Sequence, residues 1–242
     1  MVLPNLNTIV LATRNSGKVK EFQSLLRTLD CRILSLHDVG IDFEVEESGT
    51  TFVENARLKA VTYSNRTSFP VLADDSGLEV TALEGRPGVH SARYAGDDAT
   101  DEARNTKLLA ALDGKEENRE ARFLCALALA KEGAVLLESE GECRGEIIGA
   151  PRGQNGFGYD PIFLLPELAK TFAEMSPSEK NRFSHRTRAV RQMLKKLNQY
   201  GSAPALGAGS PRFKSGRPDQ FSKPTKPRLN LLFLKLNMVY EQ

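Results

Sequence analysis

Two adjacent aspartates, Asp74 and Asp75, come directly after the short apolar run 70–73, before Ser76 and a glycine. Carboxylates at the end of a buried strand repel each other and lose hydration, so a cation or hydrogen bonds must compensate them. Mg²⁺ suits this place, because it takes one or two protein carboxylates and completes its shell with waters and substrate phosphates. The alternative is an Asp-Ser-Gly turn whose acids bond local amides. We favour a metal site, which one of the acids within residues 44–47 is in a position to join.

The polar turn Thr13-Arg14-Asn15-Ser16-Gly17-Lys18 lies between a predicted strand and a predicted helix. Free N–H groups and the positive dipole end at a helix N-terminus favour a phosphate. Lys18 adds a full charge, and Thr13 and Asn15 add hydrogen bonds. The turn is not a Walker A loop, because Ala12 replaces the first glycine and Val19 replaces the Ser/Thr. A polar helix cap with a solvated lysine is the competing interpretation.

A glycine-rich loop at 153–160 carries Phe157, Gly158, Tyr159 and Asp160. Its three glycines permit close backbone approach and present two rings and a carboxylate, which are suited to stacking on a base. The spacing is not G-x-G-x-x-G, so a dinucleotide-binding fold is not indicated. A tight turn with core aromatics is an equally good explanation.

A cluster of cations and a histidine follows the helix start at 176–179, and it comprises Lys180, Arg182, His185, Arg186 and Arg188. These side chains suit phosphates or base edges, although an exposed basic helix face would look the same. A phosphate cradle, acidic metal ligands, an aromatic loop and a basic cluster complement one another chemically. Together they predict an enzyme that hydrolyses nucleoside triphosphates with Mg²⁺ as cofactor.

The elements that must position these groups alternate between strands and helices. Apolar runs predict buried strands at 8–12 and 70–73, and alternation predicts a half-exposed strand at 41–45. Residues 121–130 and 134–148 predict antiparallel strands. Helices are expected from Lys18, from the capping box at Thr51, from Thr100, from Ser176 and, with an amphipathic face, up to Leu197. This order indicates an α/β fold with a mixed sheet.

The composition is that of an ordinary globular protein, with 242 residues, 40% hydrophobic and 26% charged. No run approaches the roughly 18 apolar residues that a membrane span needs, and the N-terminus lacks the features of a secretory signal. The three cysteines, Cys31, Cys125 and Cys143, form no zinc-type pair. We therefore expect a cytoplasmic protein without a membrane partner.

The last 42 residues differ from the rest of the chain. Residues 201–242 carry seven basic and two acidic residues, so the basic excess of the whole chain belongs to them. The stretch 201–222 mixes Gly, Ser, Pro and Ala without periodicity, which is typical of a linker. We expect a catalytic domain at 1–200 and a flexible tail at 201–242. The acidic body indicates no stable nucleic-acid partner.

At these residues the chain resembles the inosine triphosphate pyrophosphatase family, which comprises dITP/XTP pyrophosphatases. The matching blocks come in the family's order and extend over about residues 7–198. They are ATRNSGK (12–18), ESGTTFVENA (47–56), ADDSGL (73–78), PGVHSARY (87–94), GFGYDPIF (156–163) and SHR (184–186).

The resemblance implies an elongated α/β fold with a mixed sheet and flanking helices that form two lobes around an active-site cleft, and usually a homodimer. It implies the reaction NTP + H₂O → NMP + PPi, with ITP, dITP and XTP preferred to ATP and GTP. It makes Asp75 the general base and a metal ligand, and Glu46 a second metal-associated acid. It assigns substrate binding to Thr13, Arg14, Asn15, Ser16, Gly17, Lys18, Ser76, Phe157, Gly158, Tyr159, Asp160, Lys180, His185 and Arg186. A donor from His185 or Arg186 to the six-position oxygen would select against adenine.

Two other functions compete with this hypothesis. A related pyrophosphatase would act on other modified nucleotides, and only a substrate panel separates the two. A nucleic-acid-binding protein that relies on its basic tail would bind polyanions and show no Mg²⁺-dependent turnover. The acidic body and the paired aspartates argue against this second alternative.

Overall fold

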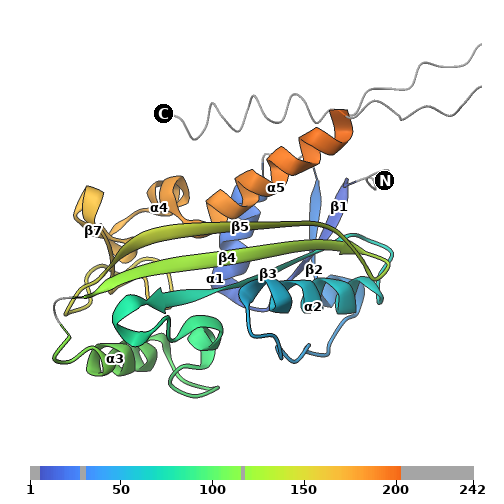
Figure 1. Ribbon diagram of the computed structural model, residues 1–242. Coiled ribbons are helices and arrows are strands. Elements are labelled where there is room, and N and C mark those ends of the chain that lie inside the picture. The colour runs from blue at the N-terminus through green and yellow to red at the C-terminus, as the bar shows by residue number, and fades with distance from the viewer. Residues whose placement is uncertain (1–5, 28–30, 116–117, 203–242) are drawn as a thin grey trace, which may run out of the picture.

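The computed structural model describes residues 6–27, 31–115 and 118–202, and its centre is one seven-stranded mixed sheet (Figure 1). The strand order is β2-β1-β3-β4-β5-β6-β7, with β1 parallel to β2 and β3 and the other neighbours antiparallel. The strands are β1 (Thr8–Ala12), β2 (Arg32–Ser35), β3 (Val71–Val80), β4 (Glu120–Lys131), β5 (Ala134–Ile147), β6 (Phe163–Leu165) and β7 (Lys170–Thr171). The predicted α/β class with a mixed sheet is confirmed.

Helices begin where the sequence supplies caps. They are α1 (Ser16–Leu26), α2 (Phe52–Ser64), α3 (Asp101–Ala111), α4 (Pro177–Phe183) and α5 (His185–Ser202), with 3₁₀ turns at His37–Val39, Thr81–Leu83, Gly88–Arg93, Pro166–Leu168 and Phe172–Glu174. Thr51 and Ser176 form capping boxes, and Asn15 and Thr100 accept from backbone N–H groups of their helices. The predicted starts of α2, α3 and α4 are confirmed.

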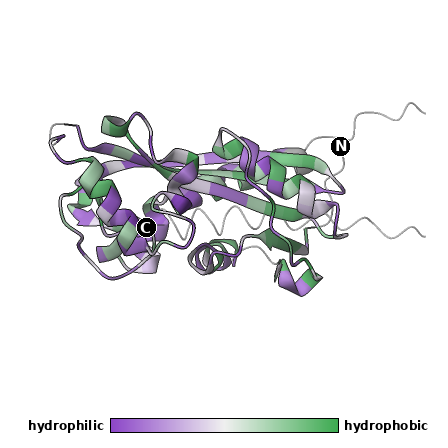
Figure 2. Ribbon diagram, turned by 90° about the horizontal axis from the view of Figure 1, so that it is seen from below, coloured by the Kyte–Doolittle hydropathy of each residue, from purple (hydrophilic) through white to green (hydrophobic). Residues whose placement is uncertain are grey.

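Helices cover both faces of the sheet, with α5 on one face and α2 on the other (Figure 1). Successive residues of β4 point to opposite faces of the sheet. Cys125, Leu127 and Leu129 pack with α5 and α1, whereas Ala126, Ala128 and Ala130 pack with α2. Small residues on the second face let α2 lie close to the strands. Hydrophobic stretches follow the strands in Figure 2.

A third apolar cluster fills the far end of the long strands, around Leu78, Phe123, Phe163 and Phe172. Along β3, Leu72 belongs to the α5 cluster and Leu78 to this third one. The polar residues 74–76 therefore lie between two apolar cores that share the same strands.

The predicted strand at 41–45 is wrong, because this segment forms no regular element. Backbone groups of this segment form hydrogen bonds with side chains and not with a neighbouring strand. Arg14 Nη2 donates to the carbonyl oxygens of Asp42 and Phe43, at 2.5 and 3.2 Å. The Val45 N–H donates to Tyr63 Oη at 3.2 Å. Alternation alone does not distinguish a strand from an extended segment held by side chains.

The predicted end of the 70–73 strand at residue 73 is also wrong, because β3 continues without interruption through residues 74–76. Its ladder with β4 pairs Asp74 with Leu127, Asp75 with Ala126 and Ser76 with Cys125. The strand does not need to end at the aspartates, because helices on both faces supply partners for the buried carboxylates.

At the C-terminus, α5 extends to Ser202, two residues beyond the expected domain boundary. The rest of the predicted tail (201–242), from residue 203 on, lies outside the described residues. The apolar face of α5 is confirmed, with Val190, Met193, Leu194 and Leu197 buried. Among the helices of the described ranges, none combines the length and the apolar character that crossing a membrane requires.

Candidate active site

The candidate site lies where β1 ends and its neighbour β3 continues. The pairing of β1 with β3 covers residues 10–12 and 71–73 only, so the next residue of β3 is Asp74, beside the turn that leads into α1. In open α/β sheets, ligands bind outside the carboxyl ends of parallel strands. The topology therefore brings the predicted phosphate-binding turn and the aspartates to one place.

Asp74 faces the α1 and α5 side of the sheet and is fully buried. Lys18 Nζ lies 2.7 Å from its Oδ1 and Arg186 Nε lies 3.9 Å from its Oδ2. Burial opposes the charge on Asp74, but Lys18, Arg186 and Lys59 outweigh it and hold the pKa at about 2. Asp74 is therefore a permanent anion that orients the Lys18 ammonium.

Asp75 faces the opposite side of the sheet, toward α2, because successive residues of a strand point to opposite faces. Asn55 Nδ2 donates to its Oδ2 at 3.1 Å, and Lys59 Nζ lies 3.5 Å from its Oδ1. Burial raises the pKa of Asp75; Lys59 and Lys18 oppose this effect, whereas Glu47 and Asp74 add to it. A carboxylate with a raised pKa is suited to accepting a proton.

The second acid near Asp75 is Glu47, and not the predicted Glu46. Lys59 Nζ lies 2.5 Å from Glu47 Oε1 and so bridges Glu47 and Asp75, whereas the Glu46 side chain is exposed. Asn55 fixes the same segment, because its Oδ1 accepts from the Gly49 N–H at 2.8 Å.

The two carboxylates of Asp75 and Glu47 fit an ion that takes few protein ligands and completes its shell with substrate phosphates. No group of three or more His, Cys, Asp or Glu side chains in metal-binding arrangement occurs among the residues that the structure describes. Asp75 and Glu47 are therefore the residues that could hold a divalent cation together with substrate oxygens.

The phosphate-binding turn uses part of its polar atoms for its own capping. Asn15 Oδ1 accepts from the Lys18 N–H at 2.9 Å, and Thr13 Oγ1 accepts from the Asn15 N–H at 3.3 Å. Ser16 is exposed and Gly17 partly exposed at the first turn of α1. The Arg14 side chain donates to the carbonyl oxygens of Asp42 and Phe43 and so connects the turn to the segment 41–45.

A buried charge network joins α1 to the basic cluster. Glu21 Oε1 lies 2.7 Å from Lys180 Nζ, and Glu21 Oε2 lies 2.7 Å from Arg186 Nη1. The two cations lie 5.0 and 5.2 Å from the centre of the Phe157 ring. Arg186 Nη2 also donates to Ser76 Oγ at 2.8 Å. These contacts therefore connect the basic cluster and the aromatic loop to α1.

Phe157 lies directly against the first turn of α1. A Cβ added to Gly17 would come within 2.5 Å of the Phe157 ring, so no other residue type fits this contact without a shift of the ring. The ring thus borders the N–H groups that suit a phosphate.

The rest of the glycine loop is bound to neighbouring parts of the protein. Asp160 is buried and its Oδ2 accepts from Lys180 Nζ at 2.5 Å and from the Phe157 N–H at 2.9 Å. Tyr159 is buried in the third apolar cluster, and its Oη donates to the Ser91 carbonyl oxygen at 2.9 Å. Of the two predicted aromatic rings, Phe157 alone lies beside the cations.

His185 is buried and stacks on Phe123 with ring centres 4.8 Å apart. Within the described ranges, neither ring nitrogen has a hydrogen-bond partner. Burial lowers the pKa of His185 well below its usual value, and Arg186 and Lys180 add to this effect. The ring is therefore neutral at physiological pH.

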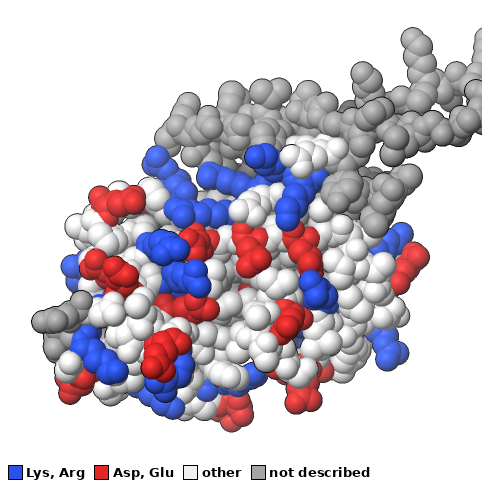
Figure 3. All heavy atoms as spheres, in the orientation of Figure 1, with Lys and Arg blue, Asp and Glu red and all other residues white. Residues whose placement is uncertain are grey.

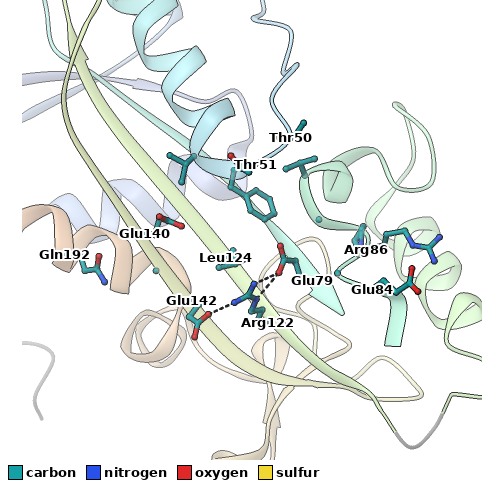
Figure 4. A pocket seen from close by; sticks show the side chains of 17 residues that line it. Thr50, Thr51, Glu79, Glu84, Arg86, Arg122, Leu124, Glu140, Glu142 and Gln192 are labelled. Atoms are coloured by element: carbon teal, nitrogen blue, oxygen red, sulfur yellow. Dashed lines mark hydrogen bonds and ion pairs between the residues drawn. The ribbon is translucent and has the colours of Figure 1, made fainter. Parts of the chain in front are cut away.

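A separate groove of about 780 Å³ lies between the first turn of α2 and residues 84–89 (Figure 4). In its floor, Arg122 is held by Glu79 at 2.8 Å and by Glu142 at 3.0 Å. None of the predicted site residues lines it. On the face seen in Figure 3, basic side chains gather in a band near the upper edge, and acidic side chains lie below and among them.

Sequence reasoning missed Glu21, Asn55 and Lys59, and it named Glu46 and not Glu47, which Lys59 links to Asp75. A signal for Asn55 and Lys59 was present, because residues four apart share one helix face. Glu21 follows Lys18 by three residues, which also places both on one side of α1. Assigning 71–80 as one strand would have put Asp74 and Asp75 on opposite faces.

The chain is similar to known proteins over most of its length. A model of the Ham1 family matches residues 9–196. The dITP/XTP pyrophosphatase of Geobacillus kaustophilus is 53% identical over 186 residues, which are 76% of this chain and 91% of the relative. The dITP/XTP pyrophosphatase of Gloeobacter violaceus is 55% identical over 186 residues, which are 77% of this chain and 92% of that relative. A HAM1 protein structure from Coxiella burnetii has a TM-score of 0.72 and 46% identity, covering 79% of this chain and 98% of that one.

Proposed function

The chain belongs to the Ham1 family, and on that premise we propose that it hydrolyses non-standard purine nucleoside triphosphates, namely dITP, XTP and ITP, to the monophosphate and pyrophosphate. One observation carries the proposal. The first turn of α1, the two aspartates of β3 and the Phe157–Arg186 pair converge where β1 ends. They provide separate places for phosphates, for water and for a base.

The triphosphate binds at the first turn of α1. Free N–H groups there point outward, and Lys18 brings a charge whose position Asp74 fixes at 2.7 Å. Because Asp74 is an anion over the whole physiological range, it orients the Lys18 ammonium before the substrate arrives. A preorganised cation stabilises charge that develops on phosphate oxygens without reorganisation.

Asp75 acts as the general base. It accepts a proton from the water that attacks the α-phosphorus, and the pyrophosphate departs. The raised pKa of Asp75, caused first by burial, suits this role. Asp75 and Glu47 are the residues that would hold Mg²⁺, which supplies positive charge for the phosphate oxygens. Lys59, between the two carboxylates, keeps them in place.

The base lies against Phe157, with Arg186 as the donor to the six-position oxygen that hypoxanthine and xanthine share. Arg186 is the better candidate than His185, because its guanidinium lies 5.2 Å from the centre of the Phe157 ring, whereas the His185 ring stacks on Phe123. A site built to donate at this position leaves its donor unpaired against the amino group of adenine.

The enzyme works as a cytoplasmic homodimer.

Pyrophosphate release from dITP, XTP, ITP, dGTP, dATP and dTTP, with Mg²⁺ or with EDTA, tests the proposal on the full chain. We expect Mg²⁺-dependent release that is fastest with the first three substrates. Turnover that is equal for all six, or equal in EDTA, would contradict the substrate class or the metal. Size-exclusion chromatography with light scattering tests the homodimer.

A further inference from the structure

The loop that carries Phe157 is held from outside the site by α3. The Gly158 N–H donates to Asp101 Oδ2 at 2.7 Å, and Asn105 Nδ2 donates to the Gly158 carbonyl oxygen at 3.1 Å. Asp101 and Asn105 are four residues apart, so they lie on one face of the helix. Both polar groups of one glycine are thus bound by a single helical turn that is more than 50 residues away in the sequence.

Asn105 is buried, with 5% of its surface exposed. A buried amide is costly unless it is hydrogen-bonded. Across the described ranges, the side-chain oxygen of Asn105 has no hydrogen-bond partner. Its side-chain nitrogen donates to the Gly158 carbonyl oxygen. An apolar residue would fill this position more cheaply, which indicates that the contact with the loop is the reason for the asparagine.

The contact acts on Phe157 itself. The Phe157 N–H is bound by Asp160 and the next N–H along the chain, that of Gly158, by Asp101. Gly158 has a φ of +63°, a conformation that side-chain-bearing residues rarely adopt, so this point of the loop favours glycine. With both flanking N–H groups anchored on carboxylates, the Phe157 ring is set against Gly17 and beneath Arg186.

We propose that Asp101 and Asn105 are positioning residues that fix the Phe157 ring for purine binding, an inference that rests on the proposed function. They touch no part of the phosphate-binding turn and neither of the β3 aspartates. Loss of either bond leaves the chemistry intact and lowers the fraction of molecules whose ring is placed to receive the base. The effect therefore falls on KM for the nucleotide and not on kcat.

The variants are Asp101→Ala and Asn105→Ala, with Asp101→Asn as the conservative form that keeps an acceptor for the Gly158 N–H. Exposed neighbours on the same helix give matched controls, Glu102→Ala and Thr106→Ala. We expect KM for dITP to rise roughly 3- to 10-fold for each alanine variant, as one lost hydrogen bond implies, with kcat within about two-fold. Asp101→Asn and the controls should stay within about two-fold of the wild type in both constants.

Hydrogen exchange gives a readout that does not depend on turnover. Peptides that contain 156–160 should exchange faster in the two alanine variants, while those from β4 and α5 keep their wild-type rates. If exchange rises throughout the molecule while kcat falls and KM is unchanged, the residues serve stability alone and the proposal is wrong. Unchanged KM together with unchanged exchange at 156–160 would also overturn it.

The two proposals fail separately. If the wild type releases no pyrophosphate from dITP or XTP, the proposed substrate class fails and the exchange data alone decide whether α3 anchors the loop. If the wild type is active and the alanine variants match it in KM, the positioning role fails while the function stands.

Discussion

Adjacent aspartates of one strand should make opposite contributions to stability as the pH changes. The pKa of Asp74 is lowered from 3.8 to about 2. At about 1.4 kcal/mol for each pKa unit, its charge contributes about 2 kcal/mol to the free energy of unfolding. Because the folded pKa is below the unfolded one, this stability is present above pH 4 and is lost as the pH falls through 2.

Asp74→Asn removes this contribution and keeps the shape of the side chain. The difference in unfolding free energy between wild type and variant should shrink by about 2 kcal/mol from pH 6 to pH 2, and about half of this change should occur by pH 3. Asp75→Asn is the matched control. The pKa of Asp75 is raised, so its charge costs stability as the pH rises through that value, and the pH trend of this variant should have the opposite sign.

Urea unfolding of the full chain, followed by far-ultraviolet circular dichroism in EDTA at several pH values, measures both differences. EDTA keeps metal binding out of the comparison. A difference for Asp74→Asn that does not change with pH would refute the reasoning, because it would mean that Lys18 and Arg186 do not hold the carboxylate as an anion. Equal trends for the two variants would show that both aspartates share one environment.

Three further predictions concern activity and the segment beside α1. Asp75→Asn should lower kcat by roughly 100-fold or more, as loss of a general base implies, while circular dichroism stays unchanged; full turnover would contradict its role. Glu47→Gln should raise the Mg²⁺ concentration for half-maximal rate roughly 10-fold, as expected for a lost charge-assisted contact. Glu46→Gln should leave this concentration unchanged, and equal responses of the two variants would contradict the choice of Glu47 over Glu46. Arg14→Ala should accelerate hydrogen exchange at residues 41–50, and protection equal to wild type would mean that Arg14 does not hold them.

The sequence was sufficient for elements whose signals are local. The capping boxes at Thr51 and Ser176 mark helix starts because one side chain and the next turn decide them. The buried strands at 8–12 and 70–73 were predictable because short apolar runs bounded by polar residues are typical of buried strands. The candidate site was found in outline because each of its parts is a short motif.

What escaped prediction depends on contacts between distant segments. Whether a strand continues through Asp74 and Asp75 depends on Lys18, Lys59 and Arg186, which come from three different helices. The choice between two neighbouring glutamates depends on which one Lys59 reaches. No local pattern contains this information, because it arises only when β1, β3, α2 and α5 are packed together.

The uninterrupted course of β3 has a chemical consequence. If the chain turned at Asp74, both aspartates would share one environment, and their mutual repulsion would raise the pKa of one of them without deciding which. In a strand, the period of two assigns them to different faces, so Lys18 and Arg186 neutralise Asp74 while Asp75 keeps a raised pKa. A shift of β3 by one residue would exchange the two environments. The ladder between β3 and β4, which fixes this register over ten residue pairs, therefore keeps Asp74 and Asp75 in their two different environments.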